Sequence, residues 1–214
     1  MSPPISAIYS SPYYRCIETV VPFARQTGHK IRVDRGLGEF HSKAPWVQPT
    51  SAPRDVLDGL FPGVLDGTYA DTGLVPSPYG ETVREVHERV GKSLAELVRR
   101  ADDEGLVSIV IATHAASAVA MARMLTLGQP PKDLLDGGIV AHTAGLCEFK
   151  RGKEMLGGWE CKRLFDCTFL SSGEERGWSF EMFVEEESDT AKELLMLDEA
   201  KMTWVESKAA RERL

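Results

Sequence analysis

The stretch LVSIVIATH, residues 106–114, decides the fold class. Residues 106–112 form the most apolar strand-like run of the chain, and continuous runs of this kind are typical of a parallel strand covered on both faces. Thr113 and His114 follow, and the sequence from about Ala115 to Leu127, closed by Gly128, predicts a helix. A buried strand that leads directly into a helix indicates an α/β fold.

A second strand–helix unit lies near the N-terminus. Residues 5–8 predict a buried strand, and Ser11 and Pro12 suit the N-cap and first position of the next helix. Gly28 suits the end of that helix. Pro22 lies inside it and predicts a kink or a break.

Residues 41–80 differ in character from these units. After a short strand predicted at 31–33, prolines and glycines are interleaved, which indicates a long loop with one short helix at 54–60. Loops of this length inside a domain are commonly functional. We therefore expect 41–80 to be a lid or an insert.

The remaining elements complete one domain, predicted to span 1–187. Residues 82–101 predict an amphipathic helix, with valines and leucines on one face. Two shorter strands are expected near 145–150 and 159–169. Residues 188–214 are highly charged and predict a separate C-terminal helix.

Composition limits the function classes. The chain has 214 residues, enough for one good core, and its net charge of −7 argues against direct nucleic-acid binding. No apolar run approaches the roughly 18 residues of a membrane span, and the N-terminus lacks the order of a signal peptide. The four cysteines include no C-x-x-C pair, so we expect reduced thiols in the nucleus or cytoplasm. A zinc site made by His142, Cys147, Cys161 and Cys167 stays open, although their spacing matches no common ligand pattern.

Arg15 and His114 occupy equivalent places in the two units, directly after a strand and at the start of a helix. A cation in the first turn of a helix costs roughly 0.3 kcal/mol against the helix dipole, unless an anion occupies the site. The carboxyl ends of parallel strands and the starts of helices favour such anions. The pattern indicates a phosphate site, with a solvated arginine and a backbone-capping histidine as the alternative.

Four segments carry a resemblance to a known family: AIYSSPYYRCIETVVPFA (7–24), RVDRGLGEF (32–40), PYGETVREVHERVGKSLAELV (78–98) and VSIVIATHAASAVAMARMLTLG (107–128). In this order they resemble the histidine phosphatase (phosphoglycerate mutase-like) superfamily of hydrolases and mutases. The resemblance implies a three-layer α/β/α sandwich with a mostly parallel sheet.

The resemblance also implies roles for individual residues. Arg15 matches the arginine that holds the transferring phosphoryl group, and Glu39 matches the general acid. His114 matches the second histidine, which hydrogen-bonds the phosphoryl oxygens, and Thr113 is expected to lend its hydroxyl or its backbone N–H. His41 either reaches the same pocket or is a surface histidine. The family's chemistry implies no metal and no cofactor.

One part of the family pattern is absent. The family's nucleophile is a histidine in an Arg-His-Gly motif, and this sequence contains no Arg-His-Gly. The family's first strand and helix should precede residue 5, and that strand lies beside the one at 107–112. Either the neighbouring strands close the gap, or a second chain pairs with the open edge, or the chain is an incomplete version of a longer protein.

Two functions follow as expectations. The first is a histidine phosphatase-like protein with a phosphate-binding pocket, which acts on or binds the phosphomonoester of a small molecule or a phosphoprotein. As given, it is expected to be catalytically incomplete, a pseudoenzyme. The second is a non-catalytic interaction module, because SSPYYRC and GEERGWSFE (173–181) resemble phosphatase-like domains in the RNA polymerase III transcription machinery. A protein partner is then expected at the C-terminal helix or the open sheet edge. No membrane association is expected.

Overall fold

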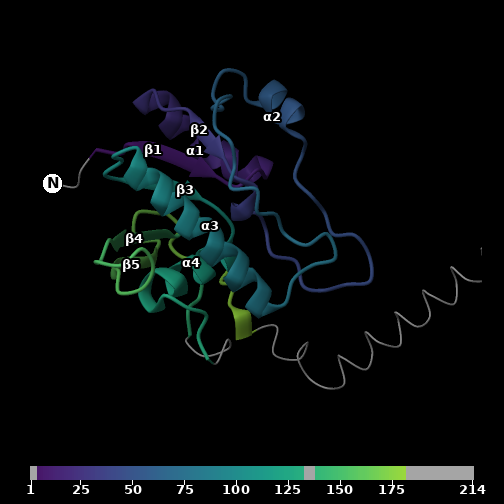
Figure 1. Cartoon of the computed structure of the whole chain (residues 1–214), viewed down its shortest axis with the longest axis vertical. Helices are drawn as coiled ribbons and strands as arrows, with labels where there is room; N and C mark the ends of the chain where they lie inside the picture. Colours follow the sequence, from purple (N-terminus) through teal and green to yellow (C-terminus); the bar gives the residue numbers. More distant parts are fainter. Residues whose placement is uncertain (1–3, 133–137, 182–214) are drawn as a thin grey trace, which may run out of the picture.

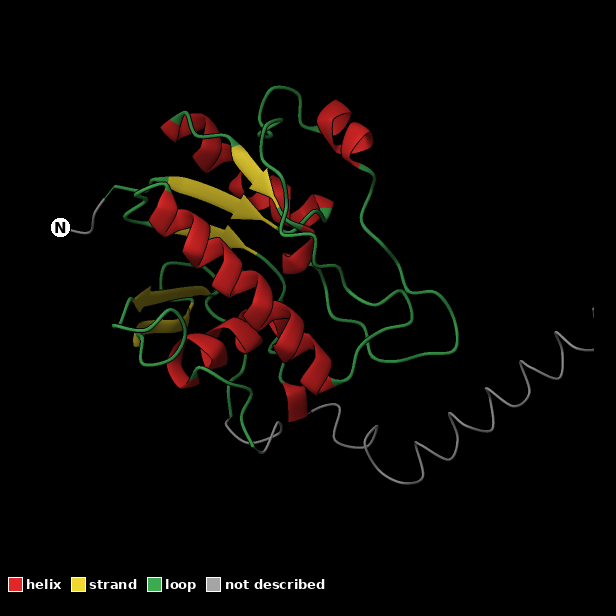
Figure 2. Cartoon of the chain, viewed as in Figure 1, coloured by secondary structure: helices red, strands yellow, loops and turns green. Residues whose placement is uncertain are grey.

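The computed structural model describes residues 4–132 and 138–181, so the helix predicted for 188–214 lies outside the described residues. Figures 1 and 2 show the arrangement of the elements. In chain order these are β1 (Ala7–Ser10), α1 (Tyr14–Thr27), β2 (Ile31–Val33), the 3₁₀ turn η1 (Arg35–Leu37), α2 (Arg54–Leu60), α3 (Val83–Asp103), β3 (Ile109–Ala112), α4 (Ala115–Leu127), β4 (Leu146–Lys150) and β5 (Glu160–Asp166).

The main sheet has the strand order β2-β1-β3, and both pairings are parallel. Ile8 is aligned with Ile31 on one side and with Val110 on the other. The two late strands form a separate antiparallel pair, β4 with β5. The predicted α/β class with a mostly parallel sheet is confirmed.

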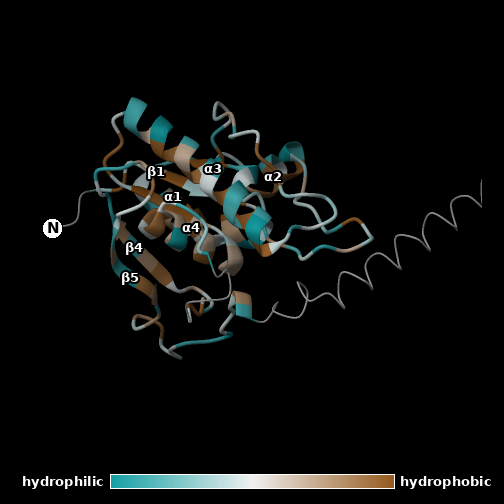
Figure 3. Ribbon diagram, turned by 60° about the horizontal axis from the view of Figure 1, so that its bottom comes forward, coloured by the Kyte–Doolittle hydropathy of each residue, from teal (hydrophilic) through white to brown (hydrophobic). Residues whose placement is uncertain are grey.

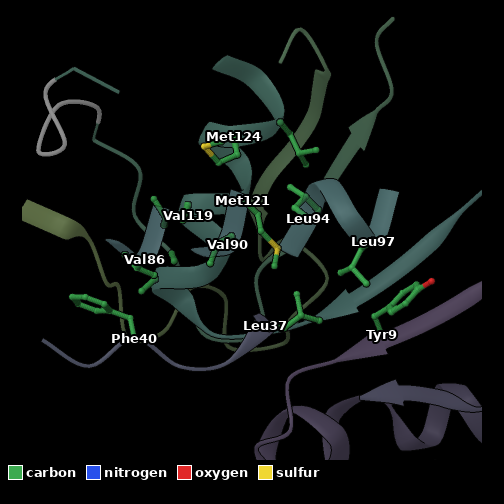
Figure 4. Packing of buried hydrophobic residues seen from close by; sticks show 14 of the residues in the cluster. Tyr9, Leu37, Phe40, Val86, Val90, Leu94, Leu97, Val119, Met121 and Met124 are labelled. Carbon is green, nitrogen blue, oxygen red and sulfur yellow. The ribbon is translucent and has the colours of Figure 1, made fainter. Parts of the chain in front are cut away.

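The side chains of β1 alternate between two cores, because helices pack on both faces of this sheet. Ala7 and Tyr9 pack with residues of α3 and α4, whereas Ile8 packs with residues of α1. All four residues of β1 are buried, as expected for a central strand. Figure 4 shows the first core, in which Tyr9, Leu37, Phe40, Val86, Val90, Leu94, Leu97, Val119, Met121 and Met124 are labelled.

Strand β3 pairs with β1 along one of its two edges. Tyr9 is aligned with Ile111, and the Ser11 N–H donates to the Ala112 carbonyl at 2.8 Å. This pairing occupies one edge of β3 only, so the three alternatives for the strand expected at the other edge stay predictions. Within 4–132 and 138–181, the far edge of β3 has no strand beside it.

Helix α1 departs from its prediction at two points. It begins at Tyr14 with Tyr13 as N-cap, so the predicted capping by Ser11 and Pro12 is wrong. Pro22 lies inside the helix without breaking it. Proline has no N–H, so the Glu18 carbonyl lacks its partner within the helix. Both residues are exposed, so water can take the place of that hydrogen bond. The end at Gly28 is confirmed, since this residue adopts the left-handed conformation with φ 75°.

Helix α3 is the amphipathic helix predicted for this region, and Figure 3 shows hydrophilic and hydrophobic stretches alternating along it. Its start is a capping box in which Thr82 accepts from the Glu85 N–H and Glu85 accepts from the Thr82 N–H. Among the helices in the described ranges, none has the length and apolarity needed to cross a membrane.

The 41–80 segment contains α2 at the predicted residues and is tied to the domain at several points. Buried Asp34 accepts hydrogen bonds from the Tyr69 hydroxyl at 2.7 Å and from the Thr72 N–H at 2.9 Å. Residue 65 bridges to β2, since the Ile31 N–H donates to the Val64 carbonyl. The second half of this segment is therefore part of the packed structure.

Candidate functional site

Arg15, Glu39 and His114 converge at the carboxyl ends of β1 and β3. Arg15 lies in the first turn of α1, Glu39 follows η1, and His114 is the N-cap residue of α4. The Arg15 Nη2 atom lies 2.8 Å from Glu39 Oε2 and 2.9 Å from His114 Nδ1. His114 Nδ1 lies 3.1 Å from the same Glu39 oxygen. The predicted meeting of the three side chains is confirmed as geometry.

The Glu39 carboxylate contacts both Arg15 and His114. Its Oε2 oxygen faces both the guanidinium and the imidazole, and its Oε1 oxygen accepts from the Phe40 N–H at 2.9 Å. The site therefore already holds one negative charge of its own. A bound phosphate has to displace this carboxylate or share Arg15 with it.

The pKa of Glu39 has moved away from the value that a general acid needs. Burial alone raises it, but the contacts with His114, the Phe40 N–H and the Arg15 charge outweigh burial and leave the pKa below its usual value. Glu39 is thus ionised at neutral pH in this arrangement. A general acid needs a proton near the working pH, so Glu39 could act as one only after its contacts with His114 and Arg15 have been broken.

Ser11 completes a chain of contacts that the sequence analysis did not identify. Its Oγ lies 2.7 Å from His114 Nε2, on the opposite side of the ring from Glu39. A serine, a histidine and a carboxylate in this order resemble a nucleophilic triad. Ser11 is 0% exposed, however, so its hydroxyl holds the imidazole rather than meeting a substrate. Its place directly after β1 was the available signal.

Cys16 and Tyr13 form the walls around His114. Burial raises the pKa of the Cys16 thiol to about 11, so the sulfur is neutral although it lies 3.6 Å from His114 Nε2. The Tyr13 ring packs edge-on against the imidazole with ring centroids 4.9 Å apart. The Tyr13 hydroxyl donates to the Pro49 carbonyl at 2.8 Å and lies 3.4 Å from His41 Nε2. The 41–80 segment thus reaches the cluster through Tyr13, and His41 contacts this wall.

Thr113 directs its hydroxyl away from the cluster. Its Oγ1 donates to the Leu37 carbonyl at 2.8 Å, which links the end of β3 to η1. The Thr113 hydroxyl and backbone N–H were the two groups expected to contact a ligand, and the hydroxyl proton is already donated to Leu37. The backbone N–H of Thr113 is the group that stays a prediction.

His29, His87 and His142 make their contacts outside this cluster. His29 contacts the Ile5 carbonyl, and His87 is buried beside the Val83 carbonyl, with its pKa lowered by burial to about 4. His142 pairs with Glu174 at 3.6 Å. In the part of the chain that the structure describes, no group of three or more His, Cys, Asp or Glu side chains could hold a metal ion. The zinc site considered for His142 and three cysteines is not formed.

Comparison with known families and curated proteins gives two findings. The model of the histidine phosphatase superfamily (branch 1) matches residues 2–166. The chain is also 29% identical over 209 residues to the transcription factor tau 55 kDa subunit of Saccharomyces cerevisiae, a match that covers 86% of this chain and 48% of the yeast protein. The chain thus spans about half the length of this relative.

Solved structures show the same fold. An ecdysone phosphate phosphatase from Bombix mori, in complex with tungstate, matches with a TM-score of 0.56 at 19% identity, over 85% of this chain and 70% of that one. A mycobacterial glucosyl-3-phosphoglycerate phosphatase with inorganic phosphate matches with a TM-score of 0.50 at 25% identity, over 77% of this chain and 79% of that one. The likeness extends across most of each chain.

Proposed function

Because the chain belongs to the histidine phosphatase superfamily, we propose that the cluster of Arg15, Glu39 and His114 binds the phosphoryl group of a phosphomonoester. The observation that carries this proposal is the meeting of the three side chains where β1 and β3 end. The mycobacterial phosphatase that resembles this chain holds inorganic phosphate, which supports the same ligand class here.

Binding follows from the charges of the cluster. A phosphate oxygen that replaces the Glu39 carboxylate receives the Arg15 guanidinium and an imidazole N–H in a charge-assisted arrangement. The Arg15 side chain is 60% exposed, so it reaches an incoming anion without rearrangement of the core. The surface ion pair that it gives up is worth at most about 1 kcal/mol.

The second part of the proposal is that the chain, as given, does not hydrolyse the ester that it binds. Family chemistry needs an exposed nucleophilic imidazole, and the sequence lacks the Arg-His-Gly motif that carries it. Two other nucleophiles lie near the cluster, but Ser11 is fully buried and the Cys16 thiol is neutral. The proposal is therefore a phosphate-binding pseudoenzyme.

Inorganic phosphate and vanadate test the binding site directly. An arginine contact to phosphate contributes about 1.5–3 kcal/mol, so Arg15→Ala should weaken binding of either anion by more than tenfold. Arg25→Ala is the matched control, because Arg25 is exposed in the last turn of the same helix and its removal changes the net charge equally. Equal affinities of both variants, measured by titration calorimetry or NMR, would rule out the proposed phosphate site.

A second candidate function is a non-catalytic interaction subunit of the RNA polymerase III transcription factor C complex, located in the nucleus. The similarity to the transcription factor tau 55 kDa subunit, which covers most of this chain, favours it. Candidate contact surfaces are the far edge of β3 and the C-terminal segment 188–214. Co-precipitation of the tagged chain with subunits of that complex tests this function, and Arg15→Ala should leave the interaction intact. An Arg15→Ala variant that loses phosphate binding but keeps the protein interaction would separate the two functions.

A further inference from the structure

Arg89 and Glu81 form a buried ion pair next to the cluster. Arg89 Nε donates to Glu81 Oε1 at 2.6 Å and Nη2 donates to Oε2 at 2.7 Å, in a bidentate arrangement. Their side chains are 6% and 5% exposed. Arg89 lies on α3, and Glu81 directly precedes the capping residue of that helix. Neither residue contacts Arg15 or His114 in the hydrogen bonds described above.

The remaining nitrogen of Arg89 points at the segment that carries Glu39. Its Nη1 atom donates to the Gly36 carbonyl at 2.7 Å and to the Gly38 carbonyl at 3.3 Å. The guanidinium is a planar fork with donors in fixed directions, so one buried side chain holds a carboxylate and two backbone carbonyls together.

Two other side chains hold the same short segment. The Thr113 hydroxyl donates to the Leu37 carbonyl at 2.8 Å, and the Ser117 hydroxyl donates to the Gly38 carbonyl at 2.8 Å. Three consecutive carbonyls before Glu39 thus accept hydrogen bonds from side chains of α3 or of the β3–α4 region. Leu37 itself is 0% exposed and lies in the core with Met121 and Leu97 (Figure 4).

We propose that Arg89 is a positioning residue that places the Glu39 carboxylate between Arg15 and His114 without touching the ligand. The inference rests on the proposed function, in which Glu39 competes with phosphate for Arg15. Hydrogen bonds act only over a short distance, so the position of the backbone at Glu39 decides whether they form. The contacts of Glu39 Oε2 are 2.8 Å and 3.1 Å long, and a backbone shift of about 1 Å removes them.

A purely structural ion pair would stabilise the domain and leave the cluster unchanged. The readout that separates the two roles is the pKa of Glu39, measured by carboxyl carbon NMR in the full chain. Its lowered pKa reports the contacts to His114, the Phe40 N–H and Arg15 after the opposing effect of burial. Arg89→Lys keeps the positive charge but cannot reproduce the fork.

In Arg89→Lys we expect the pKa of Glu39 to rise toward the ordinary value of a glutamate. Arg32→Lys is the matched control, because Arg32 also makes a bidentate pair, with Glu104 at 3.0 and 2.7 Å, and contacts the Tyr9 hydroxyl. This control should leave the pKa of Glu39 as low as in the wild type. A folded Arg89→Lys protein with an unchanged Glu39 pKa would overturn the proposal.

A second variant guards against unfolding. Replacing both partners, Arg89→Met with Glu81→Leu, removes the buried charges together, which is often tolerated. It also removes the Arg89 hydrogen bonds to Gly36 and Gly38, while Ser117 still donates to Gly38. It should show the same rise in the pKa of Glu39, and an unchanged pKa would contradict the proposal. If the wild type binds no phosphate, the proposed function fails, while the Glu39 titration still decides the role of Arg89.

Discussion

At the scale of single residues, the central feature of the cluster is the contact of the Glu39 carboxylate with both Arg15 and His114. The carboxylate is held by Arg15 and His114, and its pKa lies below the usual value because these contacts outweigh burial. A group with a lowered folded pKa stabilises the fold above its unfolded pKa. That contribution is lost as the pH falls through the folded value. We therefore expect protonation of Glu39 to leave Arg15 and the His114 imidazole available to another anion.

This coupling predicts that anion binding strengthens as the pH falls through the pKa of Glu39. Sulfate is the suitable probe, because it stays doubly charged over this range. Glu39→Gln should bind sulfate severalfold more tightly at neutral pH, since the exposed Arg15 no longer has a competing carboxylate worth up to about 1 kcal/mol. Affinities measured by calorimetry from pH 6 down to the lowest pH at which the chain stays folded test this, because the pKa of Glu39 lies below the ordinary glutamate value.

The variant supplies its own control. In Glu39→Gln the part of the pH dependence that belongs to Glu39 should disappear. If the variant and the wild type show the same affinity and the same pH profile, the carboxylate does not compete with the anion.

At the scale of elements, the turn η1 is the part that brings Glu39 to the sheet. Its Gly36 packs so closely against α3 that a side chain cannot fit: a Cβ there would lie 1.7 Å from Ser93 Oγ and 2.9 Å from Ser93 Cβ. The Gly36 N–H also donates to buried Asp34 at 2.9 Å. The close approach lets Arg89 on the same helix reach the Gly36 carbonyl.

Gly36→Ala should therefore destabilise the domain by about 1–3 kcal/mol, the usual cost of overpacking. The matched control is Gly59→Ala in α2, where a Cβ meets nothing within 4 Å and alanine is the better helix former. Urea unfolding of both variants gives the comparison. Adding Ser93→Gly to Gly36→Ala should recover part of the loss, and no recovery would argue against the contact with Ser93.

At the scale of the whole molecule, the family fold brings Arg15, Glu39 and His114 together while the sequence lacks the nucleophile motif. β1 and β3 pair directly, so the strands that carry Arg15 and His114 into the site stand side by side. A site of this kind can bind an ester and still leave its hydrolysis slow, because only interactions that strengthen in the transition state accelerate the reaction.

We therefore predict that this chain does not turn over p-nitrophenyl phosphate and forms no phosphohistidine. Loss of a covalent nucleophile commonly costs several powers of ten in rate. The check is a turnover assay together with mass spectrometry of the chain after exposure to a reactive phosphate donor. An acid-labile phosphate on His114, or turnover that is lost in His114→Ala, would show a working enzyme with a rearranged site.

Much of the fold follows from local patterns in the sequence. The apolar run before His114, the amphipathic pattern of α3, and the glycines that end α1 and α4 predicted the α/β class and most elements. These signals are local, because a strand or helix shows its burial in its own periodicity. The continuity of α1 through Pro22 was not predictable in this way, since it depends on that side of the helix facing water.

The sequence by itself determined which residues stand at the ends of the strands, and thus that Arg15 and His114 share one end of the sheet. Only the tertiary structure decided what they meet there. Ser11 lies 103 positions from His114, and Arg89 lies 53 positions from Gly36. Such contacts leave no periodic trace in the chain. They form because packing of α3 and α4 against the sheet brings buried polar groups together, and each buried polar group must find a partner.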